Sequence, residues 1–272
     1  MPITLKLESE DYKRQVARRF DRAAPSYDTY AKFQQQVLQQ LLRKLPHEAF
    51  SRVMDLGTGT GQALASLCSH SPVAQCVAVD LSSSMLSTAR EQCGDKSAQF
   101  VCADAEALPF AGGSFDLLFS SLALQWCLSP AILFAELSRV LETDGWLMFA
   151  TLTQGSMPEV TEAWQGLDDN DHIHHYMSFE KLLDAVAFET GLTVMSKQLS
   201  KITMWFDSPQ SAIHSLTKVG ASLISADQSA ISPTKWKAFL AQYEQQRTAA
   251  GVPLSYQVAF VVARKKETGL GN

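Results

Sequence analysis

The sequence has little of what marks secreted, membrane and zinc-binding proteins. Its 272 residues include five cysteines. They are scattered, odd in number and without a C-x-x-C pair, so neither a disulfide framework nor a zinc site is expected. Every apolar run falls short of the ~20 residues that cross a bilayer. The opening MPITLKLESEDYKRQ lacks an apolar stretch after a basic one and does not predict a secretory signal. We therefore expect a cytoplasmic protein with reduced thiols.

An excess of positive charge is also missing. Lys and Arg number 23 against 28 Asp and Glu, a net charge of −5, which argues against a general nucleic-acid-binding protein. The charge is nevertheless uneven, because residues 1–52 carry ten Lys and Arg against six Asp and Glu. A basic leader on an acidic body predicts that the leader contacts something anionic.

What the sequence does have is a long alternation of apolar runs and helical patterns. The leader predicts two helices, near 9–23 and 28–45, the second with Asp28 as its N-cap. Helical stretches then separate five apolar runs, at residues 52–57, 76–81, 98–104, 115–123 and 145–152. Near-continuous apolar strands between helices predict an α/β fold, with a parallel sheet covered on both faces.

The tail changes character after residue 155. A polar helical region at 156–190 precedes a strand-like run near 192–206. Helices from Pro209 and Pro233 and a last strand at 255–264 follow. Two late strands after five parallel ones fit a seven-stranded, mostly parallel sheet with an antiparallel edge hairpin.

The strongest motif is D-L-G-T-G-T-G-Q, from Asp55 to Gln62, where the first strand turns into its helix. Glycines here let the backbone approach a ligand closely, at the edge where open α/β sheets bind ligands. The G-x-G-x-G spacing differs from the G-x-G-x-x-G that wraps a pyrophosphate. It therefore favours S-adenosylmethionine (SAM), which has no pyrophosphate, over a dinucleotide. We expect Asp55 to orient the SAM ammonium.

Two acidic residues follow at the next strand ends. Asp80 ends the second run, where a carboxylate can accept hydrogen bonds from both ribose hydroxyls; its alternative role is an N-cap. Asp104, followed by Ala105, ends the third run and can read the adenine edge; its alternative is an ordinary Asx turn. A glycine-rich loop alone is often a tight turn, but these three strand ends together predict a SAM pocket.

Over roughly residues 50–152 the sequence resembles the class I SAM-dependent methyltransferases. The phrases DLGTGTG, VAVDLSSSML, CADAEALPF and GSFDLLFSSLALQW are similar to four motifs of that family. A narrower resemblance runs nearly end to end, through VARRFDRAAPSYDTYAKFQQQV, SSLALQWC, TLTQGSMPEVTEAWQ, TMWFDSPQSAIHSLTKVGA and PLSYQVAFVVAR. These phrases are similar to the malonyl-[acyl-carrier protein] O-methyltransferases of biotin synthesis.

The resemblance implies a Rossmann-like class I methyltransferase fold with an N-terminal lid. We expect the helical lid in residues 1–50 and the SAM-binding α/β core in 51–155. Residues 156–266 complete the same domain as a substrate cap. The implied reaction methylates the free carboxylate of a malonyl thioester on acyl-carrier protein, releasing S-adenosylhomocysteine (SAH). The methyl ester then enters biotin (pimeloyl) synthesis.

The same motifs assign the cofactor pocket. We predict cofactor contacts from Asp55, Gly57, Gly59, Gly61, Gln62, Asp80, Leu81, Met85, Asp104, Ala105 and Ser121. A carboxylate acceptor is ionised at neutral pH, so the expected catalysis is orientation of the reacting groups. Neither a general base nor a metal is expected.

A desolvated acceptor carboxylate needs polar partners. We predict that Tyr27 and Gln125 orient it and that Arg22, Trp126 and Lys218 also bind substrate. The alternatives are an aromatic staple at a helix start for Tyr27 and core packing for Trp126. Relatives tend to have a lysine one position before Lys218. A one-residue shift turns a helical side chain by ~100°, which argues against the carboxylate-binding role for Lys218.

The leader also carries the predicted partner surface. Arg14, Arg18 and Arg22 are spaced i, i+4, i+8 and share one helical face. A carrier protein is typically acidic, so this face is the predicted docking surface; the alternative is a solvated helix face.

Other functions stay open at this point. A methyltransferase for a quinone precursor or other small molecule needs a base near the motifs, and none stands there. A non-catalytic SAM-binding partner protein is a further alternative. His172, His174 and His175 cluster in a polar segment that predicts a mobile loop rather than a metal site.

Overall fold

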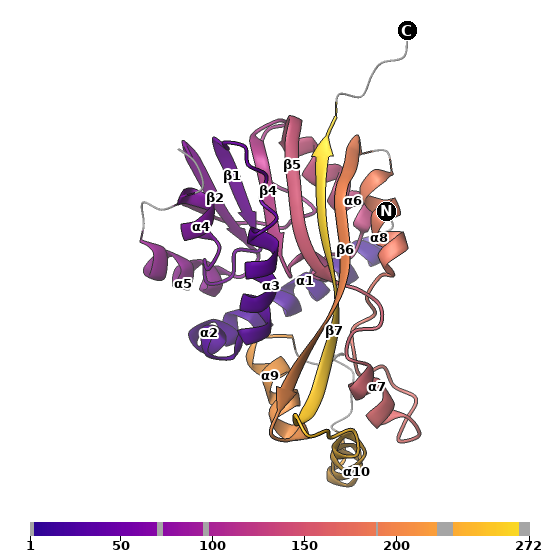
Figure 1. Cartoon of the computed structure of the whole chain (residues 1–272). Helices are drawn as coiled ribbons and strands as arrows, with labels where there is room; N and C mark the ends of the chain where they lie inside the picture. Colours follow the sequence, from indigo (N-terminus) through magenta and orange to yellow (C-terminus); the bar gives the residue numbers. More distant parts are fainter. Residues whose placement is uncertain (1–2, 70–72, 95–97, 189, 222–230, 267–272) are drawn as a thin grey trace.

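A seven-stranded sheet in the order β3-β2-β1-β4-β5-β7-β6 forms the centre of the computed structural model (Figure 1). The structure describes residues 3–69, 73–94, 98–188, 190–221 and 231–266. The strands are β1 (Arg52–Leu56), β2 (Gln75–Asp80), β3 (Gln99–Cys102), β4 (Phe115–Ser121), β5 (Leu141–Leu152), β6 (Leu192–Phe206) and β7 (Val252–Lys265). Strands β1 to β5 pair in parallel, and β7 is antiparallel to both of its neighbours. The predicted fold class is confirmed.

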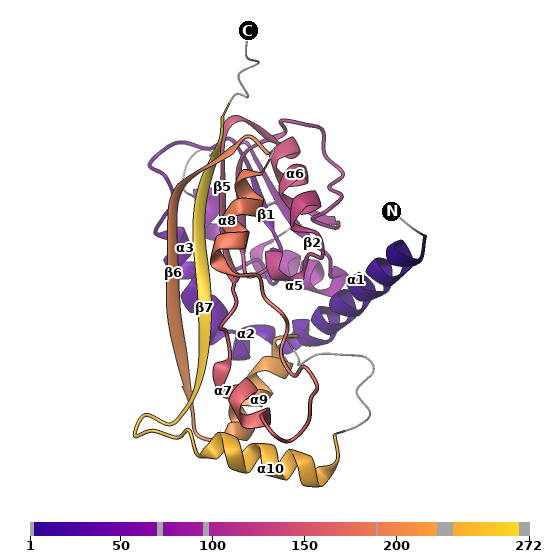
Figure 2. The same ribbon diagram turned by 90° about the vertical axis from the view of Figure 1, so that its right-hand side faces the viewer.

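Helices cover both faces of the sheet. They are α1 (Ile3–Ala23), α2 (Tyr27–Tyr30), α3 (Lys32–Leu42), α4 (Leu64–Ser69), α5 (Ser83–Cys93), α6 (Pro130–Val140), α7 (Pro158–Trp164), α8 (Phe179–Ala187), α9 (Pro209–Lys218) and α10 (Pro233–Glu244), with 3₁₀ turns η1 (Ala24–Ser26) and η2 (Leu124–Trp126). Seen edge-on, the sheet has α3 on one side and α6 and α8 on the other (Figure 2). Helix α1 lies across the carboxyl ends of the parallel strands (Figure 1).

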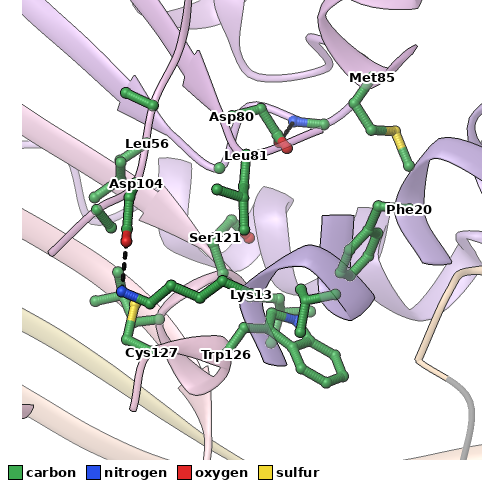
Figure 3. Close-up of a pocket in the computed structure, with 18 of the residues that line it drawn as sticks. Lys13, Phe20, Leu56, Asp80, Leu81, Met85, Asp104, Ser121, Trp126 and Cys127 are labelled. Atoms are coloured by element: carbon green, nitrogen blue, oxygen red, sulfur yellow. Dashed lines mark hydrogen bonds and ion pairs between the residues drawn. The ribbon is translucent and has the colours of Figure 1, made fainter. Parts of the chain in front are cut away.

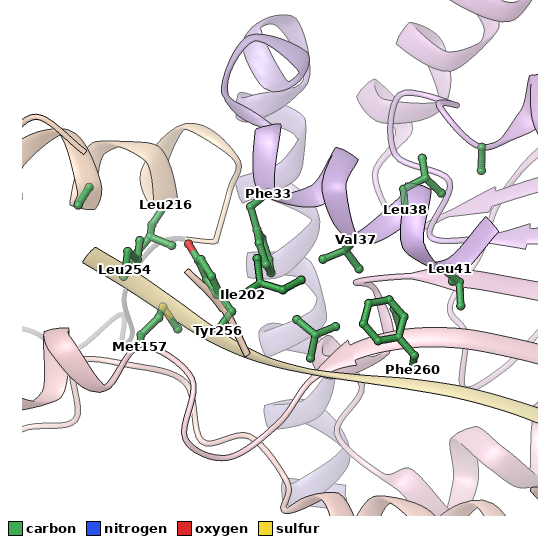
Figure 4. Packing of buried hydrophobic residues seen from close by; sticks show 14 of the residues in the cluster. Phe33, Val37, Leu38, Leu41, Met157, Ile202, Leu216, Leu254, Tyr256 and Phe260 are labelled. Atoms are coloured by element: carbon green, nitrogen blue, oxygen red, sulfur yellow. The ribbon is translucent and has the colours of Figure 1, made fainter. Parts of the chain in front are cut away.

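Two apolar cores result, one on each face of the sheet. Adjacent residues of one strand belong to different cores, as with Val53 and Met54 of β1, because strand side chains alternate between faces. Helix α3 contributes its apolar face to the first core (Figure 4). There the ring of Phe33 stacks on Tyr256 with centroids 3.8 Å apart. This helix is therefore an integral part of the folded core.

The leader differs from its prediction in one respect. The single helix expected at 28–45 is divided at Ala31, which ends α2 and precedes α3. Asp28 lies inside α2 and makes no side-chain cap, so its predicted N-cap role is wrong. Its carboxylate instead reaches the glycine-rich loop, where it accepts hydrogen bonds from Thr60 and Gln62.

The tail also differs from the predicted pattern. Within 156–190 the structure has two short helices, α7 and α8, with irregular chain from Gln165 to Ser178 between them. Strands β6 and β7 form a long hairpin whose far end carries α7, α9 and α10 (Figures 1 and 2). In the described part of the chain, no helix is both long and apolar enough to cross a membrane.

Candidate active site

A pocket opens where β1, β2, β3 and β4 end, beneath α1 and α2. It encloses about 770 Å³ of space, part of it open to solvent. Its wall is formed by Lys13, Val16, Phe20, Tyr27, Leu56, Gly57, Gly59, Asp80, Leu81, Met85, Ala103, Asp104, Ala105, Ser121, Leu122, Ala123, Leu124, Trp126 and Cys127. The first four come from the N-terminal helices, and the others come from the strand ends and the segments that follow them, including α5 and η2. The site therefore lies where the sequence predicts it, at the carboxyl edge of the sheet.

The glycine-rich loop after β1 forms one side of the pocket. Gly59 has a φ of +55°, and a Cβ added there would meet no atom within 4 Å. A side chain at this position would be strained and would take space from a ligand. The Gly59 N–H donates to Oδ2 of Asp80 at 2.9 Å, which fixes the loop against the end of β2.

Asp80 presents a carboxylate to the pocket (Figure 3). Its other oxygen, Oδ1, accepts a hydrogen bond from the Ser82 N–H at 2.8 Å. Burial raises the pKa of Asp80 above its ordinary value, and these N–H bonds offset only part of that rise. Each oxygen retains acceptor capacity for a further donor, so the two hydroxyls of a ribose fit this group. The N-cap of α5 is Ser82, which accepts from the Met85 N–H; the N-cap alternative for Asp80 is wrong.

Asp104 holds both a local turn and a residue of the N-terminal helix. Its Oδ1 accepts from the Glu106 N–H at 3.0 Å, which is the Asx-type turn expected as the alternative. Its Oδ2 is ion-paired with the Lys13 ammonium (Figure 3), which also pairs with Glu106. Burial lowers the pKa of Lys13, but the two carboxylates outweigh this and raise it. A cation therefore stands at the predicted adenine end.

The cover of the pocket is aromatic. Phe20 of α1 meets Trp126 edge-to-face, with ring centroids 5.6 Å apart and planes at 79°. Tyr27 and Phe20 pack on a small apolar cluster that contains Met85. Burial, followed by the charges of Asp80 and Asp28, raises the pKa of the Tyr27 hydroxyl. Tyr27 and Trp126 thus both line the pocket and also pack, and the predicted contact of each with the substrate stays a prediction.

Three predicted cofactor residues lie outside this wall: Asp55, Gly61 and Gln62. Asp55 is 2% exposed and accepts from the Thr58 hydroxyl at 2.7 Å; burial raises its pKa to about 7. Gly61 serves packing, because a Cβ there would lie 2.9 Å from Cys93 Sγ. The amide of Gln62 donates to Asp28. These residues support the loop from behind, and a direct cofactor contact by them stays a prediction.

Gln125 also lies outside the wall, because its amide is used internally. Nε2 donates to the Leu122 carbonyl at 2.8 Å, and Oε1 accepts from the Thr151 hydroxyl at 3.0 Å. Leu122 has a φ of +57°, a conformation that costs a non-glycine residue on the order of 1–3 kcal/mol. Gln125 therefore fixes a strained stretch of the pocket wall, and its predicted contact with the acceptor stays a prediction.

The two predicted substrate-binding cations are not in the pocket wall. The Arg22 guanidinium donates back to the Arg18 carbonyl at 3.1 Å on the exposed side of α1. The Lys218 ammonium lies 5.6 Å from the centre of the Tyr30 ring. Neither position brings the charge to the pocket, which agrees with the one-residue offset of Lys218 noted in the sequence.

The histidine cluster is dispersed over separate contacts. His172 bonds to Asp168 at 2.7 Å and stacks on Trp164 at 3.7 Å between ring centroids. His175 pairs with Asp171 instead. His172 is only 6% exposed, whereas Asp169, Asn170 and Asp171 before it are exposed, and the predicted mobile loop stays a prediction. Among the described residues, no group of three or more His, Cys, Asp or Glu could hold a metal ion.

Lys13, Phe20 and Cys127 line the pocket without having been predicted to. Lys13 carried only a charge signal in the sequence, and its partner Asp104 is 91 residues away. Phe20 fits the apolar spacing of an ordinary amphipathic helix. Cys127 follows the Gln125-Trp126 pair directly, which is the one local signal that pointed to it.

Known proteins are similar to the chain both locally and end to end. A family model described as a methyltransferase domain matches residues 54–149. Malonyl-[acyl-carrier protein] O-methyltransferase of Marinomonas sp. (strain MWYL1) is 54% identical over 267 residues, which cover 97% of this chain and 98% of that protein. The protein of the same name from Alcanivorax borkumensis is 35% identical over 92% of this chain and 86% of that one. Biotin biosynthesis bifunctional protein BioHC of Cellvibrio japonicus is 36% identical, over 93% of this chain and 50% of that protein.

Solved structures share the fold at low identity. YcgJ of Bacillus subtilis has a TM-score of 0.57 at 19% identity, covering 86% of this chain and 99% of that one. Geranyl diphosphate methyltransferase in complex with SAM has a TM-score of 0.53 at 16% identity, covering 85% of each chain. At this identity the likeness concerns the architecture alone.

Proposed function

The chain belongs to the family of malonyl-[acyl-carrier protein] O-methyltransferases, and we propose that it transfers the methyl group of SAM to the free carboxylate of a malonyl thioester on acyl-carrier protein. The product is the methyl ester that enters biotin synthesis, with SAH released. The observation that carries the proposal is the 54% identity to one such enzyme along 97% of the chain. The general methyltransferase match covers only residues 54–149, whereas the longer similarity includes the N-terminal helices and the tail.

The pocket is suited to an adenosyl sulfonium. Asp80 offers acceptors to the ribose hydroxyls, and Asp104 offers one to the adenine amino group. Gly59 leaves open space at the loop, and the apolar side chains of Leu81 and Leu124 line the pocket, where they can pack against the adenine ring. When bound, SAM supplies an electrophilic methyl group attached to a positively charged sulfur, which leaves as the thioether of SAH.

Catalysis on a carboxylate requires orientation more than proton transfer. The acceptor is ionised at neutral pH, and the described residues of the pocket wall include no histidine. Because the pKa of Tyr27 is raised, its hydroxyl stays protonated and can donate a hydrogen bond to the acceptor. Phe20 and Trp126 cover part of the pocket, and shielding of the reacting groups from water strengthens such bonds.

The test of the proposed function is a product assay. Purified protein is incubated with labelled SAM and malonyl-acyl-carrier protein, and the carrier is analysed by mass spectrometry. We expect one added methyl group that is released by mild ester hydrolysis. Transfer of label to a quinone precursor but not to the malonyl carrier would overturn the proposal.

The carrier protein is proposed to dock on α1. Arg14, Arg18 and Arg22 are all exposed on this helix, which crosses the pocket, and a carrier is typically acidic. Reversing all three charges should raise the KM for carrier-linked substrate about tenfold and leave a small malonyl thioester unaffected.

A matched control for that experiment reverses three exposed lysines elsewhere. Lys197, Lys201 and Lys237 lie on β6 and α10 and change the net charge by the same amount. The control should leave the KM for the carrier-linked substrate close to that of the wild type. Equal losses in both triple variants, or equal losses for both substrates, would show that α1 is not the docking surface.

A further inference from the structure

Three charged residues of the N-terminal helices each contact the loop after a different strand. We call α1, η1 and α2 together the outer lid (residues 3–30). Lys13 pairs with Asp104 and Glu106, after β3. Asp21 contacts the start of α5, after β2, and Asp28 contacts the glycine-rich loop, after β1. The anchors are eight and seven residues apart, about two helical turns each, so the outer lid meets the three strand ends in order.

Asp28 makes the most extensive of these contacts. Its Oδ1 accepts from the Thr60 hydroxyl at 2.7 Å and the Gln62 amide at 2.6 Å. Its Oδ2 accepts from the Gln92 amide of α5 at 2.9 Å. Hydrogen bonds to a charged acceptor are stronger than those between neutral groups. Asp28 therefore ties α2, which also carries Tyr27, to the glycine-rich loop and to α5.

Asp21 reinforces the lid at the second strand end. Its Oδ1 accepts from the Ser82 hydroxyl at 2.6 Å and from the Ser84 N–H at 3.1 Å. Ser82 is the N-cap of α5 and also donates its N–H to Asp80. The lid anchor and the predicted ribose carboxylate thus share one residue.

The apolar cluster beneath the outer lid is small. It contains Ala23, Ala24 and Met85, with Phe20 and Tyr27 packed against it. When the lid opens, water replaces the hydrogen bonds of its charged anchors, so their net contribution is smaller than their full strength, and removing one of them favours opening. The next helix, α3, is buried in the main core, so opening has a natural limit at Ala31.

We infer that the outer lid is a latch on the cofactor pocket and that Asp28 is its principal positioning residue. The inference rests on the proposed function in one respect, namely that this pocket takes the adenosyl cofactor. The ligand passes the latch in both directions. Loosening the Asp28 contacts therefore speeds both entry and release of SAH, and release more than entry, because the bound ligand also loses the lid contacts of Phe20 and Tyr27.

The test measures SAH association and dissociation rates by stopped-flow on full-length Asp28→Asn, in which the acceptor charge is lost. We expect dissociation about tenfold faster, of the order of one hydrogen bond to a charged group, with association not slower than in the wild type. Thr60→Val removes the hydroxyl that donates to Asp28 from the glycine-rich loop. It should speed release by a smaller factor, and the double variant should be less than additive.

Asp11→Asn is the matched control, because Asp11 is exposed on α1 and its ion pair among the described residues is with Arg14 of the same helix. Its rates should equal those of the wild type. Limited trypsin digestion at Arg18, Arg19 and Arg22 gives an independent readout, with SAH protecting the wild type more than Asp28→Asn.

The outcomes separate the latch from the proposed function. Wild-type protein that does not bind SAH would overturn both. Binding with unchanged rates in Asp28→Asn and Thr60→Val, or with slower association in Asp28→Asn, would overturn the latch alone, since a damaged pocket slows entry whereas a loosened latch does not.

Discussion

The two parts of the N-terminal segment are held to the protein by different forces. Helix α3 buries Phe33, Val37, Leu38 and Leu41 in the main apolar core (Figure 4). The outer lid, only a few residues earlier, rests on a small apolar cluster and is anchored at the strand ends by three charged side chains. Apolar burial stabilises a fixed element, whereas polar anchors permit exchange with water. The difference indicates that α3 serves the fold and the outer lid serves the site.

The largest expected effect tests the α3 side of this comparison. Leu41 has no exposed surface, so Leu41→Ala should lower the free energy of unfolding by about 2–5 kcal/mol. SAH affinity of the folded protein should stay unchanged. Urea unfolding and calorimetry measure the two quantities. Leu128→Ala, at a residue 45% exposed, is the control and should cost little; a similar loss in both would contradict the assignment of α3 to the core.

The second prediction concerns Asp55, which supports the glycine-rich loop from behind. Burial raises the pKa of Asp55 to about 7, so between about pH 4 and 7 the folded protein holds a proton that the unfolded chain has released. Stability therefore falls as the pH rises through this range, by up to about 1.4 kcal/mol per pH unit. Asp55→Asn removes this titration and should be more stable than the wild type at pH 8.

Urea unfolding of the ligand-free protein at pH 5 and pH 8 checks the prediction. The advantage of Asp55→Asn should be larger at pH 8 than at pH 5. Asp11→Asn, at an exposed carboxylate, should show no such difference. An advantage that is the same at both pH values would mean that Asp55 titrates normally and carries no burial cost.

A third change tests the outer lid at the opposite end from Asp28. Lys13→Met keeps the length of the side chain but removes the pairs with Asp104 and Glu106. We expect SAH affinity to fall about fivefold, because the adenine end loses its cover, while the thermal midpoint changes by only a few degrees. A large loss of stability with unchanged affinity would place Lys13 with α3 as a structural residue.

The last change is at the reacting end. Tyr27→Phe removes one hydroxyl and should lower kcat by about two- to tenfold, the value of one hydrogen bond, with SAH affinity nearly unchanged. Steady-state kinetics and calorimetry separate the two. Equal losses of turnover and affinity would show that Tyr27 serves only to pack against Met85.

The sequence predicted those parts of the protein whose signals are local. Apolar runs indicated the strands, and the motif glycines with Asp80 and Asp104 indicated the pocket. This was possible because each of these residues lies at or just after the end of an apolar run in the sequence. Long-range contacts were not accessible in the same way. The Lys13–Asp104 pair joins residues 91 positions apart. The local sequence predicts an N-cap at Asp28, whereas in the fold its carboxylate accepts a hydrogen bond from Thr60.

The tail shows the same limit. His172 follows a polar stretch that gives no local signal for burial, yet it stacks on Trp164, bonds to Asp168 and is only 6% exposed. Gln125 and Lys218 were assigned to the substrate from the family pattern. The structure uses the Gln125 amide to hold the Leu122 turn and places the Lys218 ammonium over Tyr30. Neither contact has a local signature.

Hydrogen exchange with and without SAH tests the central claim most directly, namely that an adenosyl ligand binds at the strand ends beneath the outer lid. The account predicts slower exchange at residues 57–62, 80–85 and 103–106 and in lid residues 10–30, with no change in α3. Protection confined to other regions, or none at all at saturating SAH, would contradict it.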